Sequence, residues 1–262
     1  MSWLTPVFDS FTINPMFRML CVTAHPDDEA AAFGGTIRLY HERGVETTVV
    51  CLTPGQAATH RGHAKDDHEL AAIRRKEFEV SCKILGIARG IVLDYADGQL
   101  YRAELYRVVE AVTHHVREFK PHVMLTFGPD GAVTGHTDHS MASVFATLAF
   151  EWAARSNRFP DQLTSGLQPH VTQKLYYATA GFVLPDRPTI GPAPATAIIP
   201  IGKHLETKVA AFEAHITQAP VFPMVREHIL ARAREEQFHL VARSVPSQIK
   251  MEADLFEGVK ED

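Results

Sequence analysis

The chain has 262 residues, a formal net charge of −5 at pH 7 and 45% apolar residues, which fits one large domain, or one domain with an appended C-terminal layer, around a sizeable core. Acidic and basic residues are interspersed without a basic stripe, so no nucleic-acid partner is expected. No stretch approaches the ~20 consecutive apolar residues of a membrane span, so no membrane partner is expected either.

Short apolar runs alternate with helical periodicity through the first part of the chain. The runs predict strands at Arg18–Thr23, Glu46–Thr53, Ile91–Tyr95 and His122–Phe127. The periodic segments predict helices at Glu29–Arg43, His68–Leu85, Ala103–Phe119 and Thr137–Ser156. This alternation indicates an α/β fold, a Rossmann-like and mostly parallel sheet of order 3-2-1-4-5 with helices on both faces.

The pattern changes from Arg158 onward. A fifth strand is expected at Lys174–Thr179, irregular chain through the prolines of Pro185–Pro200, and helices at His204–His215 and Met224–Glu236. We expect these elements to pack on the same sheet. The prediction is a single domain over residues 1–262, with a core at about 18–157 and a smaller C-terminal section at about 158–245.

The cysteines and the first residues bear on the compartment. Cys21, Cys51 and Cys82 lie inside apolar segments, and their odd, sparse count favours reduced, buried thiols. Residues Met1 to Phe17 show no positively charged region followed by an apolar stretch, so a signal peptide is not expected. A cytoplasmic location is predicted.

Two short segments combine histidine and aspartate just after predicted buried strands. His25-Pro26-Asp27-Asp28 follows the first strand, and His136-Thr137-Asp138-His139 follows the fourth. Ligands of open α/β sheets bind outside the carboxyl ends of the strands, where the strand order reverses. In the order 3-2-1-4 the first and fourth strands are neighbours, so both segments should converge on one crevice.

The residue types at this crevice suit a catalytic zinc ion, which binds imidazole nitrogen and carboxylate oxygen and keeps one position open. His25, Asp28 and His139 would supply three ligands, and Asp27 would remain free as a general base. His136, as an imidazolium, could stabilise an oxyanion or protonate a leaving amine. Asp138 could orient His136, as carboxylates do for histidines beside metals.

Each segment taken alone also fits a structural role. Asp28 is placed to cap a helix that starts at Glu29, and His136 and His139 could be an exposed pair on a helix. Two other functional classes compete with a hydrolase. A nucleotide-binding Rossmann protein would need a glycine-rich turn after the first strand, where this chain has His25-Pro26-Asp27-Asp28. A zinc-binding or sugar-binding protein without catalysis is the other.

These residues resemble the LmbE-like or PIG-L family of zinc-dependent N-acetylglucosaminyl deacetylases. The late stretches Lys208 to Gln218 and Glu235 to Val241 are particularly similar to the C-terminal section of the mycothiol-pathway deacetylases. The resemblance runs from about Met19 to Val241. The motifs that carry it are Ala24-His25-Pro26-Asp27-Asp28-Glu29 with Gly34-Gly35, Arg74-Arg75-Lys76-Glu77 leading to Leu85-Gly86, Asp97-Gly98, Gly135-His136-Thr137-Asp138-His139, Lys208 to Gln218 and Glu235 to Val241.

The resemblance implies one Zn²⁺ per chain, held by His25, Asp28 and His139, with Asp27 as the base and His136 as the electrostatic acid. It implies a metal-dependent N-deacetylase that acts on a small N-acetylated amino sugar and assembles as a homo-oligomer, a trimer or a hexamer. Hydrolysis of another amide within the same family is the alternative.

The resemblance also assigns substrate-binding roles. Arg74 would contact the sugar-linked substrate, and Asp97 would bind sugar hydroxyls. Without the resemblance, Arg74 fits an ion pair with Glu77 on a helix surface, and Asp97 fits a turn former before Gly98.

This chain departs from the family pattern at three positions. Thr137 replaces a proline, which should not affect the ligands. Gln56 replaces a glutamate, and Thr134 replaces a tyrosine found in some relatives. These last two changes remove a carboxylate and a phenol near the expected pocket. Specificity elements are expected in Pro54 to Asp67, Gly128 to Thr134 and Phe182 to Pro200, and none of them identifies the substrate.

Overall fold

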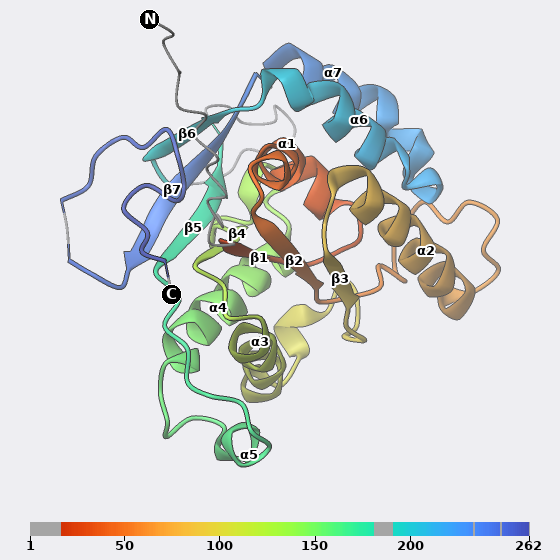
Figure 1. The fold of residues 1–262 in the computed structure, drawn as a ribbon. Coiled ribbons are helices and arrows are strands. Elements are labelled where there is room, and N and C mark those ends of the chain that lie inside the picture. The colour runs from red at the N-terminus through yellow and green to blue at the C-terminus, as the bar shows by residue number, and fades with distance from the viewer. Residues whose placement is uncertain (1–16, 181–190, 233, 247, 262) are drawn as a thin grey trace, which may run out of the picture.

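A computed structural model describes residues 17–180, 191–232, 234–246 and 248–261. A seven-stranded sheet of order β3-β2-β1-β4-β5-β7-β6 runs through the molecule, with α1, α2, α6 and α7 on one side and α3, α4 and α5 on the other (Figure 1). The strands are β1 Arg18–Thr23, β2 Glu46–Cys51, β3 Arg89–Val92, β4 Val123–Phe127, β5 Lys174–Thr179, β6 Ala197–Pro200 and β7 Glu235–Arg243. The α-helices are α1 Asp28–Glu42, α2 Asp67–Leu85, α3 Leu105–Phe119, α4 Thr137–Ala153, α5 Pro160–Thr164, α6 Leu205–Glu213 and α7 Phe222–Arg232. The 3-10 helices are η1 Leu100–Arg102, η2 Ala132–Thr134, η3 Gly202–His204 and η4 Ile216–Val221.

The first five strands are parallel, and their order confirms the prediction 3-2-1-4-5. β1 lies between β2 and β4, so the ends of β1 and β4 are adjacent. All five residues of β4 are buried, as are five of the six in β1. Such strands read as continuous apolar runs because helices cover both faces of a parallel sheet.

The C-terminal section extends the sheet in a way that the sequence pattern did not indicate. β7 pairs antiparallel with β5 on one side and with β6 on the other. β6 lies inside the stretch Pro185–Pro200, which was predicted to be irregular, so the prediction is wrong for Ala197–Pro200; residues 181–190 lie outside the described residues. Proline is tolerated in β6 because Pro200 is the last residue of an edge strand.

The predicted helix Met224–Glu236 is wrong at its end. α7 finishes at Arg232, and Glu235 and Glu236 already belong to β7. The Glu236 carboxylate is buried, where it accepts hydrogen bonds from the backbone nitrogens of Gly35 and Thr36 and from Lys208 Nζ. Tertiary contacts to α1 and α6 therefore decide this segment over its local helical tendency.

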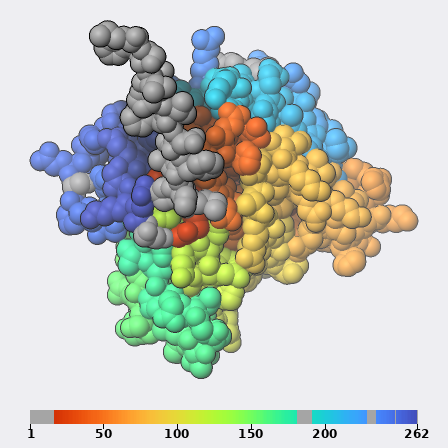
Figure 2. Space-filling model, viewed as in Figure 1, coloured from red at the N-terminus to blue at the C-terminus, as the bar shows by residue number. Residues whose placement is uncertain are grey.

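The C-terminal section packs tightly on α1, the helix that begins at the first motif. A Cβ atom at Gly35 would lie 2.3 Å from the side chain of Ile201, so only glycine permits this approach. In Figure 2 the cyan surface of the section borders directly on the orange surface that follows the first motif. Among the described helices, none has the length and apolarity to cross a membrane.

Candidate active site

The two histidine-aspartate segments meet at the carboxyl ends of β1 and β4. His25 follows β1, while β4 leads through η2 to His136 and His139 at the start of α4. The ring centroids lie 4.8 Å apart for His25 and His136, 5.4 Å for His25 and His139, and 5.2 Å for His136 and His139. The two segments are about 110 residues apart in the sequence, and they meet because β1 and β4 are hydrogen-bonded neighbours.

Asp28 lies between two of these rings. Its Oδ2 is 3.6 Å from His25 Nδ1, and its Oδ1 is 3.1 Å from His139 Nε2. Two ligands at ~2.0–2.1 Å from one tetrahedral zinc ion are about 3.3–3.4 Å apart, so these separations fit a shared metal ion. Burial alone would raise the pKa of Asp28, but the neighbouring His139 and His25 lower it below its ordinary value.

The capping role considered for Asp28 is wrong. The residue before α1 is Asp27, and Asp28 is the first residue of the helix. The Asp28 carboxylate turns back and accepts hydrogen bonds from the backbone nitrogens of Ala24, at 3.1 Å, and His25, at 2.8 Å. These bonds fix the carboxylate against the end of β1, where it faces the histidines.

In both His25 and His139, the ring nitrogen on the side away from Asp28, here called the outer nitrogen, contacts hydrogen-bond acceptors. His25 Nε2 lies 3.0 Å from Asp97 Oδ1 and 3.3 Å from Asp138 Oδ2. His139 Nδ1 lies 3.3 Å from the carbonyl oxygen of Gly131, and its ring stacks on Phe127 with centroids 4.1 Å apart. When a ring carries its single proton on this outer nitrogen, the inner nitrogen has a lone pair toward Asp28, the arrangement typical of metal-binding histidines.

Asp138 has a different partner from the one expected. Its carboxylate contacts His25 and accepts hydrogen bonds from the backbone nitrogens of Gly98, at 2.7 Å, and Leu100, at 3.1 Å. The prediction that Asp138 orients His136 is therefore replaced by a contact to His25. Burial lowers the pKa of His25, but hydrogen bonds to Asp138 and Asp97 outweigh it and raise the pKa to about 10. The sequence could not indicate this pairing because 113 residues separate the partners.

Asp97 is buried beside Asp138. One of its oxygens contacts His25 Nε2, and the other accepts a hydrogen bond from the backbone nitrogen of Ala57 at 2.8 Å. The carboxylate predicted to bind sugar hydroxyls thus already orients His25. Gly98, which follows Asp97, has a positive φ of 74°, a conformation that glycine adopts without steric cost.

Asp27 is less buried than Asp28 and adopts an uncommon backbone conformation. Its φ of 114° lies in a region that residues other than glycine rarely occupy. Its Oδ2 accepts a hydrogen bond from Arg74 Nη2 at 2.9 Å. Burial raises the pKa of Asp27, Arg74 opposes this effect and nearby Asp28 adds to it, so that the pKa lies at about 6. A carboxylate with a pKa near neutral pH suits a general base.

Arg74 is not on a helix surface, because only 3% of its side chain is exposed. Besides Asp27, its guanidinium donates to the carbonyl oxygens of Pro26 and Gly55. A Cβ atom at Gly55 would lie 2.1 Å from Arg74 Nη1, so glycine is required for this contact. The pairing with Glu77 is also wrong, since that carboxylate binds the backbone nitrogen and the hydroxyl of Thr217.

His136 is exposed at the N-terminus of α4. Its Nδ1 accepts a hydrogen bond from the backbone nitrogen of Asp138 at 3.1 Å. A backbone nitrogen can only donate, so the ring proton lies on Nε2. Partial desolvation by the surrounding protein lowers the pKa of His136, and the neighbouring His25 and His139 lower it further. The geometry therefore favours a neutral donor over the imidazolium expected from the sequence.

Gln56 and Thr134, two of the three departures from the family pattern, have side chains that contact other groups of the protein. Gln56 Nε2 donates to the carbonyl oxygen of Tyr95 at 3.4 Å. Thr134 Oγ1 lies 3.3 Å from His139 Nδ1 and 3.3 Å from the carbonyl oxygen of Gly131. The loop Pro54 to Asp67 is also tied to the C-terminal section, because Gln218 Nε2 donates to the carbonyl oxygen of His60.

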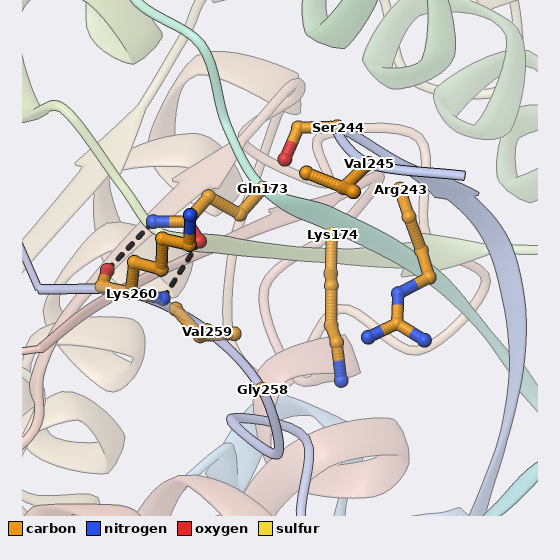
Figure 3. Close-up of a pocket in the computed structure, with 8 residues that line it drawn as sticks. All are labelled: Gln173, Lys174, Arg243, Ser244, Val245, Gly258, Val259 and Lys260. Atoms are coloured by element: carbon orange, nitrogen blue, oxygen red, sulfur yellow. Dashed lines mark hydrogen bonds between the residues drawn. The ribbon is translucent and has the colours of Figure 1, made fainter. Parts of the chain in front are cut away.

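A separate hollow of about 170 Å³ lies at the opposite end of β5 (Figure 3). Lys174 and Arg243 point into it side by side, and two hydrogen bonds join Gln173 to the backbone of Lys260. The buried Lys174 ammonium is paired with the Glu252 carboxylate at 2.9 Å. Arg243 Nη1 lies 3.8 Å from the same Glu252 oxygen, so both cations at this hollow face a carboxylate that the chain itself supplies.

Comparisons with known proteins agree with this architecture. The family model of the GlcNAc-PI de-N-acetylases, PIG-L, matches residues 20–150. The diacetylchitobiose deacetylase of Thermococcus kodakarensis is 31% identical over 215 residues, which cover 80% of this chain and 74% of the relative. The 1D-myo-inositol 2-acetamido-2-deoxy-alpha-D-glucopyranoside deacetylase 2 of Catenulispora acidiphila is 29% identical over 297 residues, which cover 92% of this chain and 97% of the relative.

Among solved structures, the N,N'-diacetylchitobiose deacetylase of Pyrococcus horikoshii matches with a TM-score of 0.69 and 26% identity, over 86% of this chain and 83% of the other. The chain belongs to the PIG-L family of de-N-acetylases. These relatives are deacetylases, which supports an enzyme of the hydrolase class. The resemblance stated from the motifs is thereby confirmed.

Proposed function

We propose that this chain is a zinc-dependent hydrolase that removes the acetyl group from an N-acetylated amino sugar. The observation that carries the proposal is the position of Asp28 between His25 Nδ1 and His139 Nε2, at 3.6 and 3.1 Å. The relatives named as deacetylases of acetylated glucosaminyl compounds support the substrate class.

His25, Asp28 and His139 would hold one zinc ion. His136 is close enough to count as a fourth candidate, because one ring nitrogen each of His25, His136 and His139 lie within 4.8 Å of one another. We keep His136 outside the ligand set because its Nδ1 accepts from the backbone nitrogen of Asp138, which leaves the ring proton on Nε2 and no free lone pair on either nitrogen. Zinc, when bound, polarises a carbonyl group and makes water more acidic.

Asp27 would take the proton from the attacking water. Arg74 holds its carboxylate by a 2.9 Å hydrogen bond, so the base keeps a fixed direction. His136 Nε2 would donate to the acetamide oxygen as that atom gains negative charge. Asp27 would then return the proton to the leaving amine, because a neutral His136 has no second proton to give.

Two features favour catalysis over simple binding. The rings of His25 and His139 are oriented by hydrogen bonds, and the Asp27 carboxylate lies outside the proposed ligand set. The second candidate function is cleavage of a different amide. It is supported by the side chains of Gln56 and Thr134, which replace a carboxylate and a phenol found in related sugar-binding pockets. A cytoplasmic location and a homo-oligomeric assembly remain predictions.

The decisive experiment combines metal analysis with a panel of N-acetylated amino sugars and other amides, read by release of free amine. We expect about one zinc per chain, release of acetate from an N-acetylated amino sugar, and loss of that activity with a chelator. Cleavage of other amides alone would favour the second candidate. Bound zinc without cleavage of any panel member would reject both.

A further inference from the structure

The carboxylate of Glu29 lies directly behind the proposed base and contacts its backbone. Glu29 Oε2 accepts a hydrogen bond from the backbone nitrogen of Asp27 at 2.9 Å. Glu29 is completely buried, although its neighbour Asp27 faces the site. A buried carboxylate two residues from the base needs its own explanation, because an unpaired buried charge is costly.

Two further donors satisfy the other oxygen of Glu29. Ser81 Oγ lies 2.5 Å from Glu29 Oε1, and His215 Nε2 lies 2.8 Å from the same atom. Both donors are fully buried. Ser81 belongs to α2, and His215 lies between α6 and η4, so three separate parts of the chain meet at one carboxylate.

This network coincides with the strained residue of the site. Asp27 has a φ of 114°, a strained conformation that persists only where the surrounding structure fixes it. Glu29 binds the backbone of Asp27, while Arg74 binds its side chain. The two contacts together determine where the carboxylate of Asp27 points.

The His215 side chain makes no other hydrogen bond among the described residues, because its Nδ1 has no partner there. Burial lowers the pKa of His215, but the Glu29 carboxylate outweighs it and raises the pKa, which keeps a proton on Nε2. The ring therefore has one polar task, which is to hold Glu29.

We propose that Glu29 is a positioning residue for the base, and that the C-terminal section completes the active site through His215. The inference rests on the proposed function. Without the Glu29 oxygen, the backbone nitrogen of Asp27 loses its acceptor and the strained conformation relaxes. The base then moves away from the attacking water, while the ligands His25, Asp28 and His139 remain in place.

The test compares zinc-loaded Glu29→Ala, Glu29→Gln and His215→Ala with the wild type. We expect Glu29→Ala to lower kcat on the order of 10²-fold with KM little changed, because misplacing a catalytic group by about 1 Å has effects of this size. Glu29→Gln keeps an oxygen for the Asp27 nitrogen and should rescue most of kcat. His215→Ala should fall between them.

His204→Ala is the matched control. His204 is another buried histidine of the C-terminal section, and its Nδ1 also faces a glutamate of α1, Glu42, at 3.7 Å. It lies at the other end of that helix, so its removal should leave kcat unchanged. An equal loss of kcat in His204→Ala and His215→Ala would overturn the proposal, since a general packing defect would then explain both.

Hydrogen exchange of the Asp27 amide supplies a readout that does not depend on activity. We expect faster exchange in Glu29→Ala than in the wild type and in Glu29→Gln. If Glu29→Ala does not fold, His215→Ala carries the same comparison. If Glu29→Ala keeps the kcat of the wild type and its Asp27 amide exchanges no faster, the positioning role is overturned. A wild type that cleaves no panel member rejects the proposed function instead, and the exchange rates still decide whether Glu29 holds Asp27.

Discussion

Two groups of buried ionisable side chains contact opposite ends of the sheet, and they differ in how their charges are paired. At the carboxyl ends of the strands, the carboxylates of Asp28, Asp97 and Asp138 converge on the rings of His25 and His139. At the other end of β5, Lys174, Tyr176 and Glu252 form a closed group in which each polar atom binds another member.

Within the closed group, the positive charge of Lys174 is paired with the negative charge of Glu252. The Lys174 ammonium lies 2.9 Å from the Glu252 carboxylate and 3.0 Å from the Tyr176 hydroxyl, and all three side chains are buried. The Tyr176 hydroxyl donates to the other oxygen of Glu252. Such a group needs no ligand, although it lines the hollow in Figure 3 through Lys174.

The group at the carboxyl ends is not closed in this sense. It has three converging carboxylates, those of Asp28, Asp97 and Asp138, and neither a lysine nor an arginine is a member. The nitrogens of His25 and His139 that face Asp28 point toward one place. It also contains a strained residue, Asp27, which the closed group lacks. Converging acceptors and stored strain are therefore better marks of function here than burial or the presence of a hollow.

The largest expected effect comes from removing a proposed ligand. Asp28→Asn keeps the shape of the side chain but removes the charge between His25 and His139. We expect zinc to be lost and deacetylation to fall by roughly 10³-fold or more, because a metal ion contributes several kcal/mol to catalysis. Zinc content by elemental analysis and amine release check this. Full zinc occupancy in the variant would contradict the ligand assignment.

The next largest effect concerns the base alone. Asp27→Asn should retain zinc and still lower kcat by roughly 10²–10⁴-fold, because the amide cannot accept the proton. Metal content must be measured on the same preparation, so that loss of the base is separated from loss of zinc. Near-wild-type turnover of the zinc-loaded variant would exclude Asp27 as the base.

The closed group should respond in the opposite way. Glu252→Ala leaves the Lys174 ammonium buried without its carboxylate, which typically costs about 3–5 kcal/mol of the free energy of unfolding. We expect a lower melting temperature with kcat unchanged at a temperature where the variant is folded. A selective loss of kcat, with stability intact, would break the contrast between the two groups.

The smallest effect concerns the thiols, which belong to neither group. Cys21, Cys51 and Cys82 are buried, and burial raises the pKa of each thiol above its ordinary value. The thiolate fraction at pH 8 is therefore lower than in an exposed cysteine, and reagents cannot reach the sulfur atoms. We expect no labelling by a thiol reagent in the folded protein and three labelled thiols in denaturant. Rapid labelling without denaturant would show that a thiol is accessible.

The sequence determined much of the fold because the period of its apolar residues is a local property. β5 was predicted with its observed bounds, Lys174–Thr179, and the parallel arrangement of the first five strands followed from their alternation with helices. Their order was expected for a Rossmann-like sheet, and it is the observed one. The convergence of the two histidine-aspartate segments also followed, because parallel strands end at one edge of the sheet. β6 and β7 were missed, since antiparallel partners and contacts to α1 define them rather than their own periodicity.

Only the tertiary structure decided how the site residues divide their tasks. Arg74 was expected at a substrate and binds Asp27, and Asp138 was expected at His136 and binds His25. The contact between Glu29 and His215 joins residues 186 positions apart, and no local pattern predicts it. Residue types in a motif reveal which chemistry is available, whereas the partner of each polar atom depends on the close approach of distant segments.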